Sequence, residues 1–174
     1  MSARQRFAFA FAACAACAAC ALFVVATAFA AGSSAAVSGV PGYSGRWELV
    51  PAASEVATGR KLPRGRVDWI QHEDVWLNVR SRSVRTSGDS VALDFRYRTD
   101  GDAINKLMGQ DIRTSGRSAN GALVFETTVK LPLIELKVHE RWSLSEKADT
   151  LVMVRDSDSP LGKEHQRLVF RRSK

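Results

Sequence analysis

Cysteine is the most informative absence in this sequence. The 174-residue chain has three cysteines, Cys14, Cys17 and Cys20, and all of them lie within the first thirty residues. The rest of the chain can therefore form no disulfide, no thiolate metal site and no cysteine nucleophile. Helical periodicity is also lacking after position 30, because no segment of ten or more residues spaces its apolar side chains at three and four. These two absences exclude thiol chemistry and a helical bundle.

Catalytic and cofactor-binding motifs are lacking as well. The sequence has no Gly-x-Ser-x-Gly nucleophile motif and no glycine-rich phosphate loop. Its three histidines, His72, His139 and His165, each adjoin a glutamate, but neighbours on a strand point to opposite faces and cannot chelate one ion. We therefore expect no enzyme, no metal and no other cofactor. Hydrolysis by two inward-facing carboxylates stays open at this point.

The N-terminus has the three regions of a secretory signal peptide. Arg4 and Arg6 give a positive start, an uncharged run follows, and residues 28–30 (Ala-Phe-Ala) form a small-x-small cleavage pattern. We predict that residues 1–30 form a signal-peptide helix that is cleaved near Ala30, which makes the mature protein periplasmic or secreted. An uncleaved anchor and lipidation at a cysteine are the alternatives. Both are disfavoured, because alanine is only weakly apolar and no leucine stands three residues before any cysteine.

The remainder divides into a flexible lead-in, residues 31–42, and a folded domain, residues 43–174. The lead-in is rich in small residues, glycine and serine. In the domain, short runs alternate apolar with polar residues, as half-buried strands do, and Asn120-Gly121 is a favoured hairpin pair. The expected strands are 46–50, 67–72, 75–79, 91–97, 122–129, 134–144, 150–154 and 167–171.

This pattern predicts an all-β fold of about eight or nine strands at the spacing of a sandwich or barrel. Short turns between consecutive strands indicate a single antiparallel meander. A meander of this length removes its exposed edges best by closing into a β-barrel. Only residues 52–57 and 103–108 have room for a turn or two of helix.

Several short motifs resemble landmarks of a group of small secreted bacterial β proteins, some of them lipocalin-like. They are residues 44–54 (SGRWELVPAAS), 97–101 (YRTDG), 141–145 (RWSLS) and 159–162 (SPLG). Gly45-x-Trp47 is also similar to the first-strand signature of lipocalins. The resemblance implies a lipocalin-like barrel, although the C-terminal helix and the disulfides of secreted lipocalins are missing.

The same resemblance implies how the barrel base is closed. In lipocalins the first-strand tryptophan packs under an arginine from near the final strand. Trp47 is that tryptophan here, and Arg171 or Arg172 is in place to make the cation–π contact. We take Trp47 and Arg171 as the candidate closure residues.

One acidic residue breaks the alternation of the long strand at 134–144. Glu140 falls on the face otherwise made of apolar residues, where a carboxylate must be paired or line a wet cavity. A β-bulge that shifts the register, or a place at the barrel rim, is the explanation we favour. The alternative is contact with a ligand. On that alternative, Tyr97, Glu140 and Trp142 are the candidate ligand-binding residues.

The sequence as a whole predicts an exported, non-enzymatic, lipocalin-like barrel that binds a small apolar or lipidic ligand. The alternative is a structural or interaction protein of the bacterial envelope, because the chain carries a net charge of +7. Such a protein would contact anionic polymers or lipids through a basic surface that includes the loop from Arg60 to Arg66. Nucleic acid is not an expected partner, since few aromatic residues are interleaved with the positive charge.

Overall fold

The computed structural model describes residues 42–174 except 108 and 132–133, so the expected signal peptide and all but the last residue of the lead-in lie outside it. The described residues form an all-β domain with one short 3-10 helix, η1 (Pro51–Ala53), and contain no helix able to cross a membrane. The strands are β1 (Gly45–Leu49), β2 (Glu55–Val56), β3 (Gly65–Glu73), β4 (Trp76–Val84), β5 (Ser90–Arg98), β6 (Asp100–Leu107), β7 (Gln110–Ala119), β8 (Ala122–Leu131), β9 (Ile134–Leu144), β10 (Thr150–Ser159) and β11 (Gly162–Ser173).

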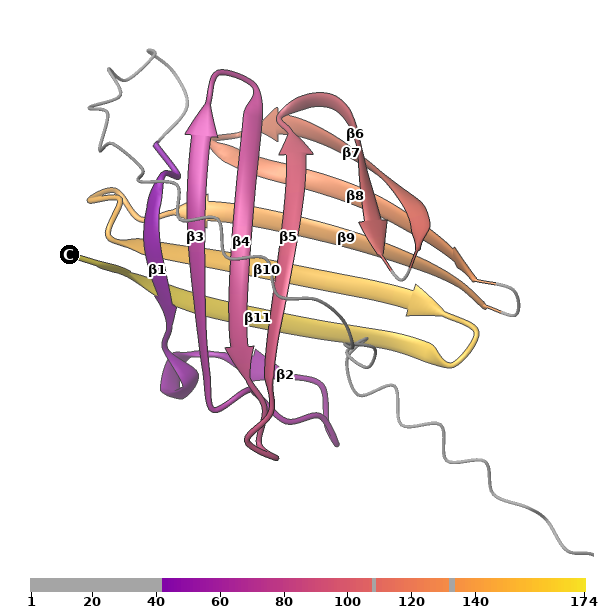
Figure 1. The fold of residues 1–174 in the computed structure, drawn as a ribbon. Coiled ribbons are helices and arrows are strands. Elements are labelled where there is room, and N and C mark those ends of the chain that lie inside the picture. The colour runs from indigo at the N-terminus through magenta and orange to yellow at the C-terminus, as the bar shows by residue number, and fades with distance from the viewer. Residues whose placement is uncertain (1–41, 108, 132–133) are drawn as a thin grey trace, which may run out of the picture. The chain divides into compact units, whose positions relative to one another are not determined.

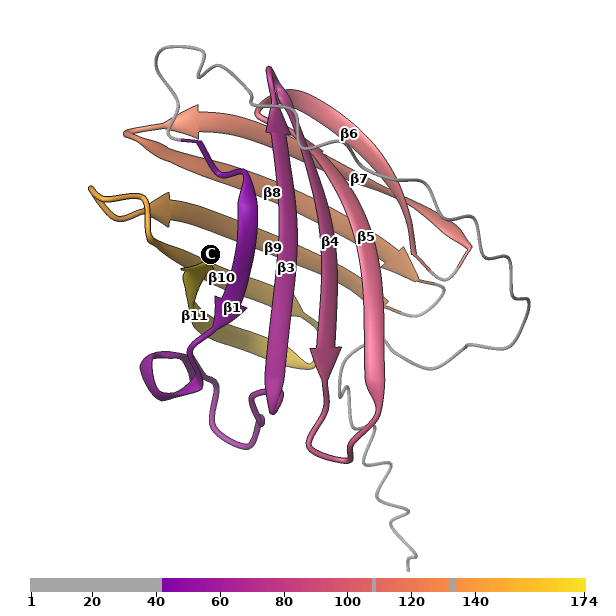
Figure 2. The same cartoon turned by 60° about the vertical axis from the view of Figure 1, so that its left-hand side comes forward.

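The strands form one antiparallel sheet in the order β5-β4-β3-β1-β11-β10-β9-β8-β7-β6, and β2 pairs with β11. Strand β1 joins the N-terminal strands to the C-terminal hairpin by pairing with both β3 and β11. In Figure 1, strands β1 and β3–β5 form a front layer that crosses the layer of β7–β11 behind it. Figure 2 shows the same two layers after a turn of 60°. The predicted fold, an antiparallel meander forming a nearly closed lipocalin-like barrel, is confirmed.

Three strands are additional to those expected from the sequence. The short β2 has only two residues, and β6 and β7 form a hairpin across residues 100–119. The inward positions of that hairpin include Gly101, Asn105, Thr114 and Gly116, so apolar residues do not alternate along it. The helical turn considered for residues 103–108 is wrong at 103–107, which are strand. The alternation of apolar and polar residues does not reveal a strand whose buried side chains are small or polar.

A cluster of large side chains fills one half of the domain interior. Phe125 and Trp142 meet edge to face with ring centres 5.2 Å apart, and Tyr97 lies 4.6 Å from Phe125. Burial of each such side chain contributes about 1.5–3 kcal/mol. The fully buried members are Tyr43, Trp47, Leu77, Leu123, Phe125, Leu151 and Phe170.

A side chain bridges the two strands that end the sheet order. Asn105 of β6 is buried, its Oδ1 accepts a hydrogen bond from the Arg96 amide of β5 at 2.7 Å, and its Nδ2 donates to the Arg96 carbonyl at 2.9 Å. The carboxamide thus presents one acceptor and one donor to β5, as a strand backbone would. Asn105 therefore connects the two edges of the barrel.

A glycine allows the end of β5 to pass close to β7. A Cβ atom at Gly116 would lie 1.8 Å from the Arg98 carbonyl oxygen and 2.9 Å from ring carbons of Phe125. Only a residue without a side chain fits between these two groups. Gly116 is therefore required for the packing of this corner.

We expect Asn105→Ala to lower the free energy of unfolding by about 1–3 kcal/mol, because the backbone amide and carbonyl of Arg96 lose their partner. Native-state hydrogen exchange should show faster exchange at the Arg96 amide. The matched control is Asn78→Ala on the outer face of β4, directly opposite Arg96. Unchanged exchange at Arg96 in the Asn105 variant would contradict the bridging role.

We expect Gly116→Ala to lower the free energy of unfolding by about 2 kcal/mol or more, because the added methyl group overlaps a backbone carbonyl. Gly101→Ala is the control, since Gly101 is the strand partner of Gly116 and its nearest neighbour would be 3.8 Å from the new Cβ. That control should change stability by less than about 0.5 kcal/mol. Urea denaturation measures both. Equal stabilities of the two variants would rule out the steric argument.

Candidate functional site

The base of the barrel is closed by an arginine over a tryptophan. The Arg172 guanidinium lies 4.3 Å from the centre of the Trp47 ring. It also donates hydrogen bonds to the carbonyl oxygens of Gly42 at 2.9 Å, Ala148 at 2.8 Å and Ser44. One side chain thus joins the start of the domain, the first strand and the β9–β10 turn.

The choice of Arg171 for this contact is wrong. In the pairing of β1 with β11, Trp47 lies opposite Arg172, whereas Arg171 lies opposite Glu48. Because successive residues of a strand point to opposite faces, Arg171 is exposed on the outer face. The sequence places an arginine pair at this position, and the register decides which member faces inward.

The structure brings the three candidate ligand-binding residues together on the inner face. The Tyr97 and Trp142 rings are 5.4 Å apart in an edge-to-face contact, and both are buried. Glu140 is 5% exposed and lies two positions before Trp142 on β9. The β9 register runs without interruption past Phe125 on one side and Arg155 on the other. The favoured explanations of Glu140, a bulge or a rim position, are therefore wrong.

Glu140 belongs to an interior charge cluster of Arg66, Asp68, Glu140 and Arg155. Glu140 forms an ion pair with Arg155 of β10. On β3, Arg66 binds Asp68 through two hydrogen bonds of 2.9 Å, and the Asp68 side chain is fully buried. A buried carboxylate is stable only with such partners.

Tyr97 lies within reach of all four charges. Burial raises the pKa of its phenol far above the ordinary value, and Glu140 adds to this effect, while Arg155 and Arg66 oppose it. The pKa of Arg155 is also raised, chiefly by the charge of Glu140. The phenol therefore stays neutral and the guanidinium stays charged at physiological pH.

Sequence reasoning missed three of the four charges. Arg155 lies one residue beyond the strand expected at 150–154, so its inward position was not apparent. Asp68 and Arg66 share the inward face of β3 with Ile70, but their two-residue spacing also fits a solvated face. The alternation of β10 contains the missing information, because Leu151, Met153 and Arg155 have the same parity. Extending the expected strand by one residue places Arg155 on the inner face.

The cluster separates a filled half of the interior from an open half. On one side lie the packed aromatic residues. On the other side, five inward apolar side chains are only half-buried, although Ile112 and Val129 of the same half are buried; the five are Val91, Leu93, Ile134, Leu136 and Val138. Arg155 points inward and yet 38% of its side chain is exposed. Solvent therefore reaches the inner face beyond the cluster.

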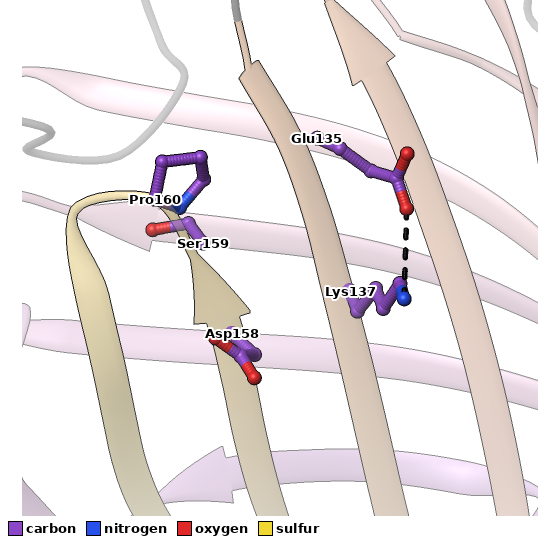
Figure 3. Close-up of a pocket in the computed structure, with 5 residues that line it drawn as sticks. All are labelled: Glu135, Lys137, Asp158, Ser159 and Pro160. Carbon is purple, nitrogen blue, oxygen red and sulfur yellow. Dashed lines mark ion pairs between the residues drawn. The ribbon is translucent and has the colours of Figure 1, made fainter.

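A separate hollow of about 340 Å³ lies where β9 and β10 approach their turns (Figure 3). It is lined by Glu135, Lys137, Asp158, Ser159 and Pro160, and the first two form an ion pair of 3.7 Å. Glu135, Lys137 and Asp158 are exposed and face outward. Since four of the five lining residues are polar or charged, this hollow offers little apolar surface to a ligand. The interior is the better candidate site.

The three histidines lie in different surroundings. His165 pairs with Asp156 on the surface at 2.7 Å, His139 is exposed, and His72 lies against the Tyr43 ring. Across residues 42–174, gaps excepted, no three metal-ligating side chains converge. The three His-Glu pairs of the sequence therefore do not meet in one site among these residues.

The basic loop considered for envelope contact presents fewer free charges than expected. Arg60 forms an ion pair with Glu164, and Arg66 is turned inward to Asp68. Lys61 and Arg64 remain exposed. A surface of four positive charges is therefore not present in this loop.

Comparison with known proteins supports the fold. No family model and no curated protein sequence matches the chain. Secretory abundant heat soluble protein 4 of Ramazzottius varieornatus superposes with a TM-score of 0.52 at 12% identity, over 80% of this chain and 100% of that one. Another such protein of that organism gives 0.52 and 12%, over 75% and 95%. Zebrafish ileal bile acid-binding protein, crystallised with cholic acid, gives 0.49 and 13%, over 75% and 98%. At such identities, the two matches above 0.5 establish the barrel fold alone.

We expect Arg172→Ala to lower the free energy of unfolding by about 2–3 kcal/mol, because the cation–π contact and several hydrogen bonds are lost together. Arg171→Ala, one position away on the outer face, should change it by less than about 0.5 kcal/mol. Thermal or urea unfolding followed by tryptophan fluorescence measures both. Greater loss in the Arg171 variant would show that the assigned register is incorrect.

Proposed function

We propose that this domain is an exported, non-enzymatic binding protein that takes up a small, largely apolar ligand. The observation that carries the proposal is the set of inward apolar side chains that stay half-buried beyond the charge cluster. A ligand that covers exposed apolar side chains inside a barrel removes their surface from water, which favours binding. In a filled core these side chains already cover one another, so no such gain is left for a ligand. Export rests on the signal-peptide features of residues 1–30.

The proposed ligand lies against β5 and β9, with its far end at the charge cluster. Val91, Leu93, Leu136 and Val138 supply the apolar lining. Arg155 is the most exposed member of the cluster and offers hydrogen-bond donors at the floor of the proposed site. Tyr97 and Glu140 border this floor, and Trp142 packs behind Tyr97.

The pairing of the interior carboxylates supports a binding role over a hydrolytic one. A two-carboxylate hydrolase needs one free general acid and one free base or nucleophile. Asp68 and Glu140 are each held by an arginine instead. Each ion pair occupies carboxylate oxygen that a general acid or base would need for proton transfer.

Binding of Nile red, an uncharged apolar dye, tests the proposal. We expect one dye molecule to bind per protein with increased fluorescence. Val138→Trp should weaken binding by about tenfold or more, because the indole fills the space beside the cluster. The matched control is His139→Trp, whose new ring lies on the outer face of the same strand. Circular dichroism verifies that both variants fold. The proposal fails if the wild type binds no dye, or if the two variants bind it equally.

A further inference from the structure

We infer that the interior selects uncharged amphiphiles, such as a long-chain alcohol or ester, over carboxylates and ammonium ions of the same chain length. This inference rests on the proposed binding function and names the ligand class of that site. Charge balance in the open half of the interior carries it.

The inward acidic groups of this half are each matched by an arginine. Two pairs belong to the cluster, Arg66 with Asp68 and Arg155 with Glu140. The third joins Arg60 to Glu164 of β11, with a distance of 3.0 Å between Arg60 Nε and Glu164 Oε1. When Arg60 of the loop before β3 is counted with the strand positions, the acids and arginines that the structure describes here are equal in number, three of each. The site therefore holds no excess charge of either sign.

A charged ligand has no free counter-charge inside this site. A carboxylate that approaches Arg155 competes with Glu140, which is 5% exposed and cannot turn to water instead. Displacing Glu140 leaves a buried carboxylate beside Tyr97, and such a group is strongly disfavoured. An ammonium ligand that approaches Glu140 leaves Arg155 unpaired in the same way.

An uncharged oxygen can bind without breaking either pair. A guanidinium has five N–H donors, and Arg155 directs its Nε and one terminal nitrogen to Glu140. Its exposed surface leaves donors for a hydroxyl or carbonyl oxygen. The polar groups on offer thus suit a ligand that accepts hydrogen bonds and carries no charge.

Displacement of Nile red by three ligands with the same twelve-carbon chain tests the inference in the wild-type protein. They are dodecan-1-ol, dodecanoate and dodecyltrimethylammonium, compared at pH 8 and below their micelle concentrations. We expect the alcohol to bind at least about tenfold more tightly than either ion. Equal or tighter binding of dodecanoate or of the ammonium ion would overturn the inference.

Two substitutions should reverse the selectivity in opposite directions. Glu140→Gln frees Arg155, so dodecanoate should gain at least about tenfold relative to the alcohol. Arg155→Gln frees Glu140, so the ammonium ion should gain by a similar factor. Asp94→Asn is the control, because Asp94 pairs with Arg80 on the outer face, and it should leave the order unchanged.

The double variant Glu140→Gln/Arg155→Gln is again uncharged at this position and should retain the wild-type order. It also provides the comparison if either single variant fails to fold. Selectivity for an ion in the double variant would contradict the role of charge balance. Failure of Nile red to bind the wild type would overturn the proposed function itself, whereas dye binding with preference for an ion would overturn only the charge selectivity.

Discussion

The ion pair between Glu140 and Arg155 is the interaction on which the interior depends. It joins β9 to β10 at the point where the packed aromatic residues end and the half-buried apolar lining begins. Neither partner is stable there alone, because a buried charge without a counter-charge is strongly disfavoured. Arg66 and Asp68 repeat the arrangement on the opposing layer, so that four charges meet around the neutral phenol of Tyr97. Polar groups thus divide one barrel into a filled half and an open half.

The filled half supplies the rigidity that an open half requires. Arg172 holds the start of the domain, the first strand and the β9–β10 turn together above Trp47. Where the sheet order ends, Asn105 connects β6 to β5 through its side chain. Because these side-chain contacts support the barrel at its base and at its edges, the barrel can stay closed without packing its whole interior. This division is consistent with a binding protein that gains affinity from preformed apolar surface.

Much of this fold could be predicted from the sequence, and the failures have a common cause. Alternation along β5 and β9 identified the strands and placed Tyr97, Glu140 and Trp142 on one face. The β6–β7 hairpin was missed because its inward positions include Asn105 and Gly116, neither of which is apolar and large. Asn105 is needed to bridge β6 to β5, and Gly116 is needed to let the end of β5 pass close to β7. Arg171 was chosen over Arg172 because sequence cannot fix a register to one residue. The partners of Glu140 could not be predicted, since they depend on pairing between strands.

Methyl NMR with added dodecan-1-ol tests whether the interior is open on only one side of the charge cluster. We expect the methyl signals of Leu93, Leu136 and Val138 to shift on titration, whereas those of Leu123 and Leu151 in the filled half should not. Shifts confined to outward residues such as Ile104, or equal shifts in both halves, would contradict this expectation.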